Sequence, residues 1–484
     1  MSLVQLVFWW TTILDKNKGA AYFSGSRDIV NRHEKFLYKS LDEIRQDTKK
    51  LGISIPISED LDIFKKPVSI GKRHIPNSLG IHPMEGCDGT SKGRPDELTF
   101  RRYDRFARGG AGLLWFEATA VVHEGRANPR QLHICEDNKE DIKKLLDSSV
   151  IAAKEEFGDD HEPYTVLQLT HSGRYSRPGE QPSPIIATQN PYLNKNIPSD
   201  YPIITDAELE ELEDRFVDAA VLAKEIGFHS VDIKSCHGYL NSELLSAFTR
   251  EGKYGGSFEN RTRFLLNIVQ KVKERVGDKL DITLRLNAYD SIPYPYGWGV
   301  DKDDFTKPDI REPIRLVKAL QEKGVKLINI STGNPYYNPH IGRPYDIGYY
   351  LPYEHPLEAI ARMLNIIQQI QNSVPQMAVM ATGFSWLREF APYVAAGGIR
   401  EGWFTLAGFG RQSFAYPDFA RDIIDKSSMD RSKCCIACGK CSEIMRDGGR
   451  TGCVIKDSKV YAPIYRQGRQ GKPPITGTHI AHHV

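Results

Sequence analysis

The sequence predicts an α/β protein of the (β/α)8 class, a TIM barrel, with an N-terminal extension and a C-terminal cysteine-rich segment. Eight short apolar segments, rich in β-branched and aromatic residues, alternate with stretches of helical periodicity, which is typical of a closed parallel barrel. An open doubly wound sheet usually has a glycine-rich turn after its first strand, whereas here that strand runs into His82-Pro83-Met84-Glu85-Gly86. The predicted strands are residues 77–83, 111–118, 164–170, 229–236, 282–287, 326–331, 377–382 and 402–406.

The helices and the flanking regions complete this organisation. Residues 207–226 and 258–276 have the clearest helical periodicity, and Ser257 is the predicted N-cap of the second helix. An amphipathic helix is expected over residues 31–50. The predicted parts are an extension over residues 1–66, a barrel over residues 67–427, and a cysteine-rich segment and tail over residues 428–484. Irregular insertions around residues 293–298 and 336–352 should lie at the C-terminal mouth of the barrel, where substrates bind.

Composition narrows the class of protein. The chain is 40% hydrophobic and 26% charged, as expected of a soluble globular protein. Its 64 basic and 62 acidic residues leave a net charge of +2, so we expect no binding to nucleic acid or to anionic lipid. No apolar stretch approaches the roughly 20 residues that span a membrane. Residues 1–10 are apolar but lack the basic leader of a signal peptide, so the expected location is cytoplasmic.

Five of the eight cysteines lie close together late in the sequence. Clustering in a long chain indicates a metal site rather than a disulfide framework. Three cysteines at three-residue intervals, with a fourth in a nearby loop, suit a [4Fe-4S] cluster; a four-cysteine zinc site is the alternative. Cys434 adjoins the set and can replace Cys435 in it. The predicted ligands are Cys435, Cys438, Cys441 and Cys453, and we expect the cluster to lie just behind the barrel.

Polar side chains follow the third and fourth predicted strands. The amide of Gln168 can donate and accept at once, which suits the pyrimidine edge of a flavin, although this residue on its own favours a Gln bonded to the backbone. Lys234, His237 and Tyr239 can together polarise a carbonyl and deliver a proton. The alternative is that Lys234 pairs with Asp232 inside the barrel, because strand alternation places both on one face.

The last strands indicate a phosphate site. Gly383 and Gly410 follow the seventh and eighth strands, where backbone N–H groups can approach a phosphate, and Arg411 adds a positive charge. Arg285, on the fifth strand, can place a fixed charge beside a cofactor. An ion pair inside the barrel is the alternative for Arg285.

Taken together, these motifs resemble the old yellow enzyme family, in particular its iron–sulfur branch with 2-enoate reductase, 2,4-dienoyl-CoA reductase and trimethylamine dehydrogenase. The resemblance covers residues 69–463, and its most specific parts are residues 237–240, residues 254–261 and the cysteine set. It implies FMN at the barrel mouth, with Tyr239 as the proton donor and Lys234 and His237 as the pair that binds the electron-withdrawing group. It also implies that the flavin contacts Pro83, Met84, Ala118, Gln168 and Arg285, with its phosphate at Gly383, Gly410 and Arg411.

The sequence departs from this family in three places. Many members have His where this chain has Lys234, and the dienoyl-CoA reductases have a histidine in the region that here contains Tyr336 and Tyr337. Only 31 residues follow Cys453, too few for the FAD and NAD domains of the larger members. The expected electron source is therefore a separate donor protein, with direct reduction by NAD(P)H as the alternative. Assembly into a homo-oligomer is compatible with the sequence.

These observations predict an FMN-dependent reductase of an activated C=C bond, an enoate or an enone, with electrons reaching FMN through the cluster. Two other functions stay open. One is amine oxidation, as in trimethylamine dehydrogenase, with a cation cage made of Tyr336, Tyr337 and Trp298. The other is a non-redox barrel lyase, with Lys234 forming a Schiff base and zinc on the four cysteines.

Overall fold

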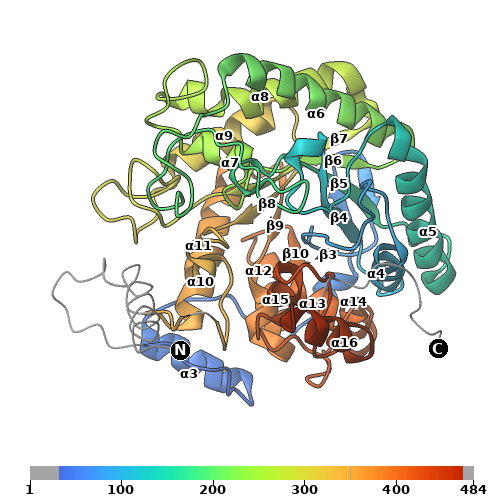
Figure 1. The fold of residues 1–484 in the computed structure, drawn as a ribbon. Coiled ribbons are helices and arrows are strands. Elements are labelled where there is room, and N and C mark those ends of the chain that lie inside the picture. The colour runs from blue at the N-terminus through green and yellow to red at the C-terminus, as the bar shows by residue number, and fades with distance from the viewer. Residues whose placement is uncertain (1–31, 349, 472–484) are drawn as a thin grey trace, which may run out of the picture.

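The computed structural model describes residues 32–348 and 350–471, and it confirms the predicted barrel (Figure 1). Eight parallel strands follow one another round a closed sheet, and β10 pairs with β3 to complete it. A two-stranded antiparallel hairpin precedes them. The strands are β1 (Val68–Ile70), β2 (Arg73–Ile75), β3 (Leu79–Ile81), β4 (Leu113–Ala120), β5 (Tyr164–Thr170), β6 (Ser230–Ile233), β7 (Asp281–Asn287), β8 (Leu327–Ser331), β9 (Ala378–Ala381) and β10 (Leu406–Phe409).

Helices surround the strands on the outside (Figure 1). In the described part of the chain, no helix is both long and apolar enough to cross a membrane. The α-helices are α3 (Leu41–Leu51), α4 (Glu97–Ala107), α5 (Lys139–Phe157), α6 (Asp206–Ile226), α7 (Leu240–Leu245), α8 (Phe258–Val276), α9 (Arg311–Glu322), α10 (Pro339–Gly342), α11 (Pro356–Ser373), α12 (Ala391–Arg400), α13 (Arg411–Ala415), α14 (Phe419–Lys426), α15 (Lys440–Arg446) and α16 (Ser458–Arg469). Short 3-10 turns lie at η1 (Asp62–Lys65), η2 (His123–Gly125), η3 (Glu136–Asn138), η4 (Gly173–Tyr175), η5 (Gly277–Lys279) and η6 (Phe384–Phe390).

The helix predicted over residues 258–276 is confirmed as α8. The hydroxyl of Ser257 accepts a hydrogen bond from the backbone N–H of Asn260, as an N-cap should. The apolar stripe of this helix, which includes Phe264, Ile268 and Val272, is fully buried. The helix predicted over residues 207–226 is likewise confirmed as α6.

The prediction for the eighth strand is wrong in position. Residues 402–405 connect α12 to the sheet: Gly402 has φ +72, and the N–H of Trp403 still bonds the carbonyl of Gly398. The strand begins at Leu406 and includes Gly408. A Cβ at Gly408 would lie 2.3 Å from Nε2 of His82. This strand therefore needs glycine for close packing inside the barrel, although glycines in a sequence usually suggest a loop.

The hairpin formed by β1 and β2 was not predicted, and it covers the N-terminal end of the barrel. Ile70 and Ile75 are fully buried in one apolar cluster with Leu113, Tyr164 and Leu327, which stand near the starts of barrel strands. The side chains of this hairpin fill the end of the barrel at which the strands begin.

The N-terminal extension packs on the outside of the barrel. Its helix was expected over residues 31–50, but α3 begins only at Leu41, because the hydroxyl of Ser40 caps the N–H of Glu43. Residues 32–39, before this cap, form neither helix nor strand. The ring of Phe36 packs edge-on against Trp386, with 5.2 Å between ring centroids. Residues 1–31, including the apolar first ten, lie outside the described residues.

The cysteine-rich segment folds back against α4. Arg101 and Arg105 of α4 both bind the carboxylate of Asp457, which is only 8% exposed, just before α16. Residues 472–484 of the tail lie outside the described residues. In Figure 1 this segment, with α15 and α16, lies beside α13 and α14 at one side of the barrel.

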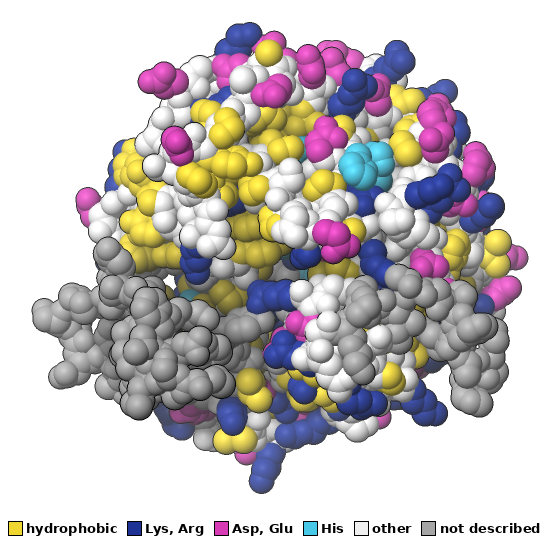
Figure 2. Space-filling view, viewed as in Figure 1, with side chains coloured by type: hydrophobic (Ala, Val, Ile, Leu, Met, Phe, Trp, Pro, Cys, Tyr) yellow, Lys and Arg dark blue, Asp and Glu magenta, His cyan; other side chains and the backbone are white. Residues whose placement is uncertain are grey.

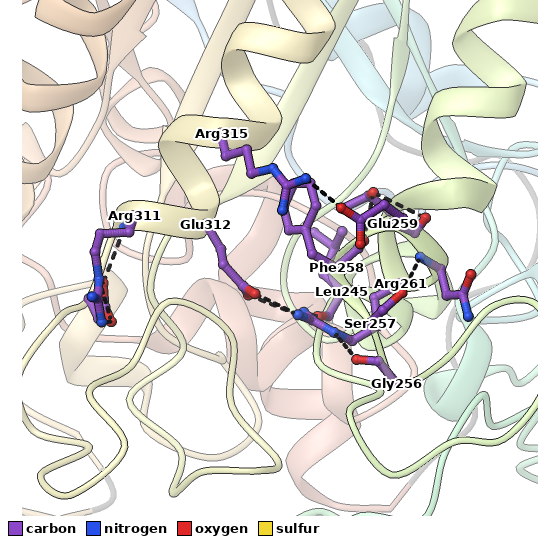
Figure 3. Close-up of polar contacts among 12 residues, drawn as sticks. Leu245, Gly256, Ser257, Phe258, Glu259, Arg261, Arg311, Glu312 and Arg315 are labelled. Carbon is purple, nitrogen blue, oxygen red and sulfur yellow. Dashed lines mark hydrogen bonds and ion pairs between the residues drawn. The ribbon is translucent and has the colours of Figure 1, made fainter.

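The family-like motif over residues 254–261 has a structural role. Arg261 is 1% exposed and donates to the carbonyls of Leu245 and Gly256 at 2.6 and 3.0 Å (Figure 3). Its other nitrogen binds both carboxylate oxygens of Glu312, at 2.8 and 2.9 Å. Arg261 thus ties together α7, the loop after it and α9, and so fixes the segment that follows the fourth barrel strand.

Candidate active site

A cavity of about 460 Å³ opens at the C-terminal ends of the barrel strands. Its walls come from loops that are far apart in the sequence, including the insertion after β8 and the cysteine-rich segment. All the side chains predicted for cofactor and substrate line this cavity, except Ala118. The predicted residues in its wall are Pro83, Met84, Gln168, Lys234, His237, Tyr239, Arg285, Gly383, Gly410 and Arg411.

Ala118 does not reach the cavity. It is fully buried in β4, at a point where the pairing of β4 with β5 changes register between Phe116 and Thr119. A bulge of this kind re-aims side chains along a strand. The direction of the Ala118 side chain could therefore not be deduced from the regular alternation of side chains along a strand.

Asp232 anchors two of the predicted cofactor residues. Its carboxylate accepts from Nε2 of Gln168 at 2.5 Å, from the backbone N–H of Arg285 at 2.7 Å and from Nε1 of Trp115 at 3.0 Å. Burial raises the pKa of Asp232 to about 6. The ion pair considered between Asp232 and Lys234 is not formed, so Asp232 holds Gln168 and Arg285 in place at the floor of the cavity.

Lys234 and Tyr239 meet at a residue that the sequence analysis did not select, Glu85. The phenol of Tyr239 donates to Oε2 of Glu85 at 2.9 Å, and Nζ of Lys234 lies 3.5 Å from the same oxygen. Nζ of Lys234 also lies 3.7 Å from the centroid of the Tyr239 ring. The hydroxyls of Tyr239 and Tyr336 are 3.1 Å apart. Glu85 lies in the loop after the first barrel strand, where side chains can reach the barrel mouth.

The protonation states of Tyr239 and His237 follow from their burial. Burial, with the nearby Glu85, holds the pKa of the Tyr239 phenol well above its usual value, so this group keeps its proton. Burial, with Arg285 and Lys234 nearby, holds the pKa of His237 well below its usual value. His237 is therefore a neutral imidazole. It adopts φ +66 in the turn that joins β6 to α7.

The predicted phosphate residues gather beyond β9 and β10. Gly383 has φ +100, a conformation that other residues rarely adopt, and a Cβ at Gly410 would lie 2.8 Å from Sδ of Met84. Arg285 donates from Nη1 to the carbonyl of Pro83 at 2.9 Å, while its buried Nε has no hydrogen-bond partner. In Figure 2, Lys and Arg side chains lie near the centre of the molecule and below it, with some Asp and Glu among them.

The four predicted cysteine ligands line a second, smaller cavity together. Two of their sulfurs accept backbone N–H bonds: Sγ of Cys435 from Ala437 at 3.4 Å, and Sγ of Cys453 from Lys456 at 3.3 Å. Burial raises the pKa of Cys435 to about 12, so a thiolate there needs a positive partner. Within residues 32–348 and 350–471, no three His, Cys, Asp or Glu side chains are placed to hold a single metal ion.

Cys434 stands apart from this group. Its thiol is fully buried and donates to the carbonyl of Asp430 at 3.4 Å, and it does not line the sulfur cavity. Of the two neighbouring cysteines, Cys435 is therefore the one that faces the other sulfurs.

The two cavities share a wall, which corrects the expectation that the cysteine site lies behind the barrel. Cys441 and Ala437 border both the sulfur cavity and the barrel cavity, as do Arg411 and Phe414. The cysteine-rich segment is thus placed at the barrel mouth, one side chain away from the space between the strand ends.

The aromatic cage proposed for a cationic substrate is not formed. Tyr336 lines the cavity and stacks on Tyr175, with 3.7 Å between ring centroids. Trp298 is 1% exposed and lies 5.6 Å from the guanidinium of Arg261, and neither it nor Tyr337 is part of the cavity wall.

Comparison with known proteins agrees with this geometry. The NADH:flavin oxidoreductase / NADH oxidase family matches residues 62–428. An NADPH dehydrogenase of a Geobacillus species is 33% identical over 273 residues, which cover 55% of this chain and 72% of that protein. NADH:flavin oxidoreductase FG08077 of Gibberella zeae is 27% identical over 286 residues, covering 55% of this chain and 66% of the relative.

Solved structures show the same fold at lower identity. A 2-naphthoyl-CoA reductase has a TM-score of 0.67 at 20% identity, covering 86% of this chain and 58% of that one. The old yellow enzyme homologue of Zymomonas mobilis has a TM-score of 0.57 at 21% identity, covering 76% and 94%. The chain thus spans only part of several proteins that it matches. The family match extends over the whole barrel, and the chain therefore belongs to the NADH:flavin oxidoreductase / NADH oxidase family, the old yellow enzyme family.

Proposed function

We propose that the chain is an FMN-dependent ene-reductase that reduces the activated C=C bond of an enone or enoate. Electrons reach FMN through a [4Fe-4S] cluster on Cys435, Cys438, Cys441 and Cys453, from a separate donor protein or, alternatively, from NAD(P)H at the flavin itself. The observation that carries this proposal is that Lys234, His237 and Tyr239 line one cavity with the residues suited to a flavin.

The residues of the barrel cavity fit FMN. Gln168 and Arg285 would hold the polar edge of the ring system, since both are fixed by Asp232 and Arg285 keeps a buried N–H without a partner. Pro83 and Met84 would lie against the ring. An arginine with glycines in the loops after β9 and β10 suits a phosphate; these residues are Gly383, Gly410 and Arg411.

The residues of the smaller cavity fit an iron–sulfur cluster. Four sulfurs line one enclosed space, and the N–H groups of Ala437 and Lys456 point at two of them. Hydrogen bonds to sulfur are among the features by which proteins tune such clusters. Because Cys441 borders both cavities, electrons would have a short path between the two centres.

FMN, when bound, would supply a hydride to the β-carbon of the substrate. The side chains of the protein would then bind the carbonyl group and supply the proton. Lys234 and the neutral His237 would donate hydrogen bonds to the carbonyl oxygen of the substrate, where negative charge develops, and one such donor is worth about 3 kcal/mol in the transition state. Tyr239 would give its proton to the α-carbon, because burial keeps the phenol protonated until that step.

The experiment that tests this function compares substrates on the reduced holoenzyme. Photoreduced protein is mixed anaerobically with cyclohexenone, cinnamate or trimethylamine, and flavin absorbance is followed. We expect reoxidation by an activated alkene and none by the amine. Oxidised enzyme that is instead reduced by the amine would support the amine dehydrogenase alternative, and inert protein without flavin would favour the zinc lyase with Lys234 as its nucleophile.

A further inference from the structure

At the end of the cavity that would receive the acceptor group of the substrate, the charge of Lys234 is paired with a carboxylate. Lys234 supplies one positive charge, but the carboxylate of Glu85 lies 3.5 Å from its Nζ. The third group, His237, is partly exposed to the cavity, and desolvation together with the nearby Arg285 and Lys234 holds the pKa of its imidazole well below the usual value. A site built to take a free carboxylate would keep the charge of its lysine uncompensated.

We propose that Glu85 determines substrate specificity: it makes the site accept an uncharged acceptor group, such as a ketone, an aldehyde or an ester, and reject a free carboxylate. This inference rests on the proposed ene-reductase function and narrows its substrate class. A carboxylate that approached Lys234 would also approach Glu85, and like charges repel strongly where little water is present to screen them. An uncharged carbonyl accepts the same hydrogen bonds without this repulsion.

Glu85 is fixed in this position by its own contacts. Its Oε1 accepts from Nε2 of Gln131 at 2.8 Å, and its Oε2 accepts from the phenol of Tyr239 at 2.9 Å. Its backbone carbonyl accepts from the hydroxyl of Thr451 at 3.2 Å. The side chain is one-fifth exposed, so it borders the space that a substrate would occupy. The carboxylate therefore cannot swing away from Lys234 without losing two hydrogen bonds.

Three other charged side chains of the cavity wall make hydrogen bonds away from this pair. Arg285 binds the carbonyl of Pro83, Arg343 donates to Oγ of Ser442 at 2.8 Å, and Arg177 donates to the carbonyl of Glu180. None of these contacts is with Glu85 or Lys234. Among the described residues, Glu85 is the one acidic side chain that lines this cavity, and it lies against Lys234.

The test compares an ester with its free acid on the holoenzyme. Turnover of methyl cinnamate and of cinnamate is measured for the wild type, for Glu85→Gln and for Glu85→Asp, with Glu322→Gln, on the distant α9, as a matched control. We expect the wild type, Glu85→Asp and the control to favour the ester. Glu85→Gln should raise the ratio of acid to ester turnover (kcat/KM) at least tenfold, which corresponds to about 1.4 kcal/mol.

A structural role of Glu85 would give a different result. If Glu85→Gln lowered both rates together through Tyr239, the ratio would stay within twofold of the wild-type value, and the specificity proposal would be overturned. A wild type that prefers cinnamate would overturn it as well.

A binding measurement separates this proposal from the proposed function. Benzamide and benzoate are titrated into the oxidised holoenzyme in a calorimeter, which requires no turnover. We expect the wild type to bind benzamide more tightly than benzoate. In Glu85→Gln, the affinity for benzoate relative to that for benzamide should rise at least tenfold. If the affinity ratio changes in Glu85→Gln but no alkene is reduced, the reductase function is refuted and the role of Glu85 in specificity is supported. If alkenes are reduced but the affinity ratio does not change, the reductase function is supported and the role of Glu85 is refuted.

Discussion

Replacing Tyr239 with Phe should lower kcat for an enone about 100-fold or more, while the protein keeps its full flavin content. Positioned general acids contribute roughly this much or more to the rate. The phenol is the one group of the trio that is both neutral and a proton donor with a raised pKa, and it lies against Lys234 and Glu85. Phe preserves the ring and its contact with the Lys234 ammonium. The decrease in kcat can therefore be attributed to the missing phenolic proton.

The measurement separates the two half-reactions. Reduction of the flavin by the electron donor should proceed in Tyr239→Phe at the wild-type rate, while reoxidation by cyclohexenone becomes slow. Tyr175→Phe is the matched control: Tyr175 stacks on Tyr336 and is not part of the cavity wall, so its variant should reoxidise at nearly the wild-type rate. Unchanged reoxidation of Tyr239→Phe would remove this tyrosine from the mechanism.

Replacing Cys453 with Ser should remove the iron–sulfur cluster and abolish turnover driven by a one-electron donor such as reduced methyl viologen. Cys453 lines the sulfur cavity from a separate loop and is the proposed fourth ligand. Loss of a cluster ligand should reduce iron from about four atoms per chain to less than one. The barrel cavity does not include Cys453, so flavin should remain bound.

Cys434→Ser is the internal control for this result. The thiol of Cys434 points to the carbonyl of Asp430 and away from the sulfur cavity. We therefore expect full iron content and wild-type turnover in that variant. Iron retained in Cys453→Ser, or lost in Cys434→Ser, would contradict the assignment of ligands.

The barrel could be predicted because its signals are local. The apolar stripe of α8 and its cap at Ser257 lie within one stretch of sequence, and the structure has the same bounds. The eighth strand was misplaced because Gly408 looks like a loop residue, and only the nearby His82 shows why a larger side chain is excluded. The hairpin that contains Ile70 and Ile75 is too short for periodicity to reveal it.

The site was predictable only in part, because some of its contacts join residues that are far apart in the sequence. Residues in the C-terminal halves of the strands and directly after them lie toward the barrel mouth, and Gln168, Lys234 and Arg285 all line the cavity there. Ala118 misses it because a bulge in β4 breaks the regular alternation. The role of Glu85 depends on a contact with Tyr239, which is 154 residues away in the sequence, and periodicity carries no information about such pairs.

The proposed function requires two redox centres in neighbouring cavities, and the cofactor content of the protein tests this requirement most directly. The wild-type protein is purified anaerobically, and its flavin, iron, acid-labile sulfide and zinc are quantified per chain. The account predicts about one FMN with about four iron and four sulfide, and a yellow-brown colour. A colourless protein with one zinc and no flavin would contradict it.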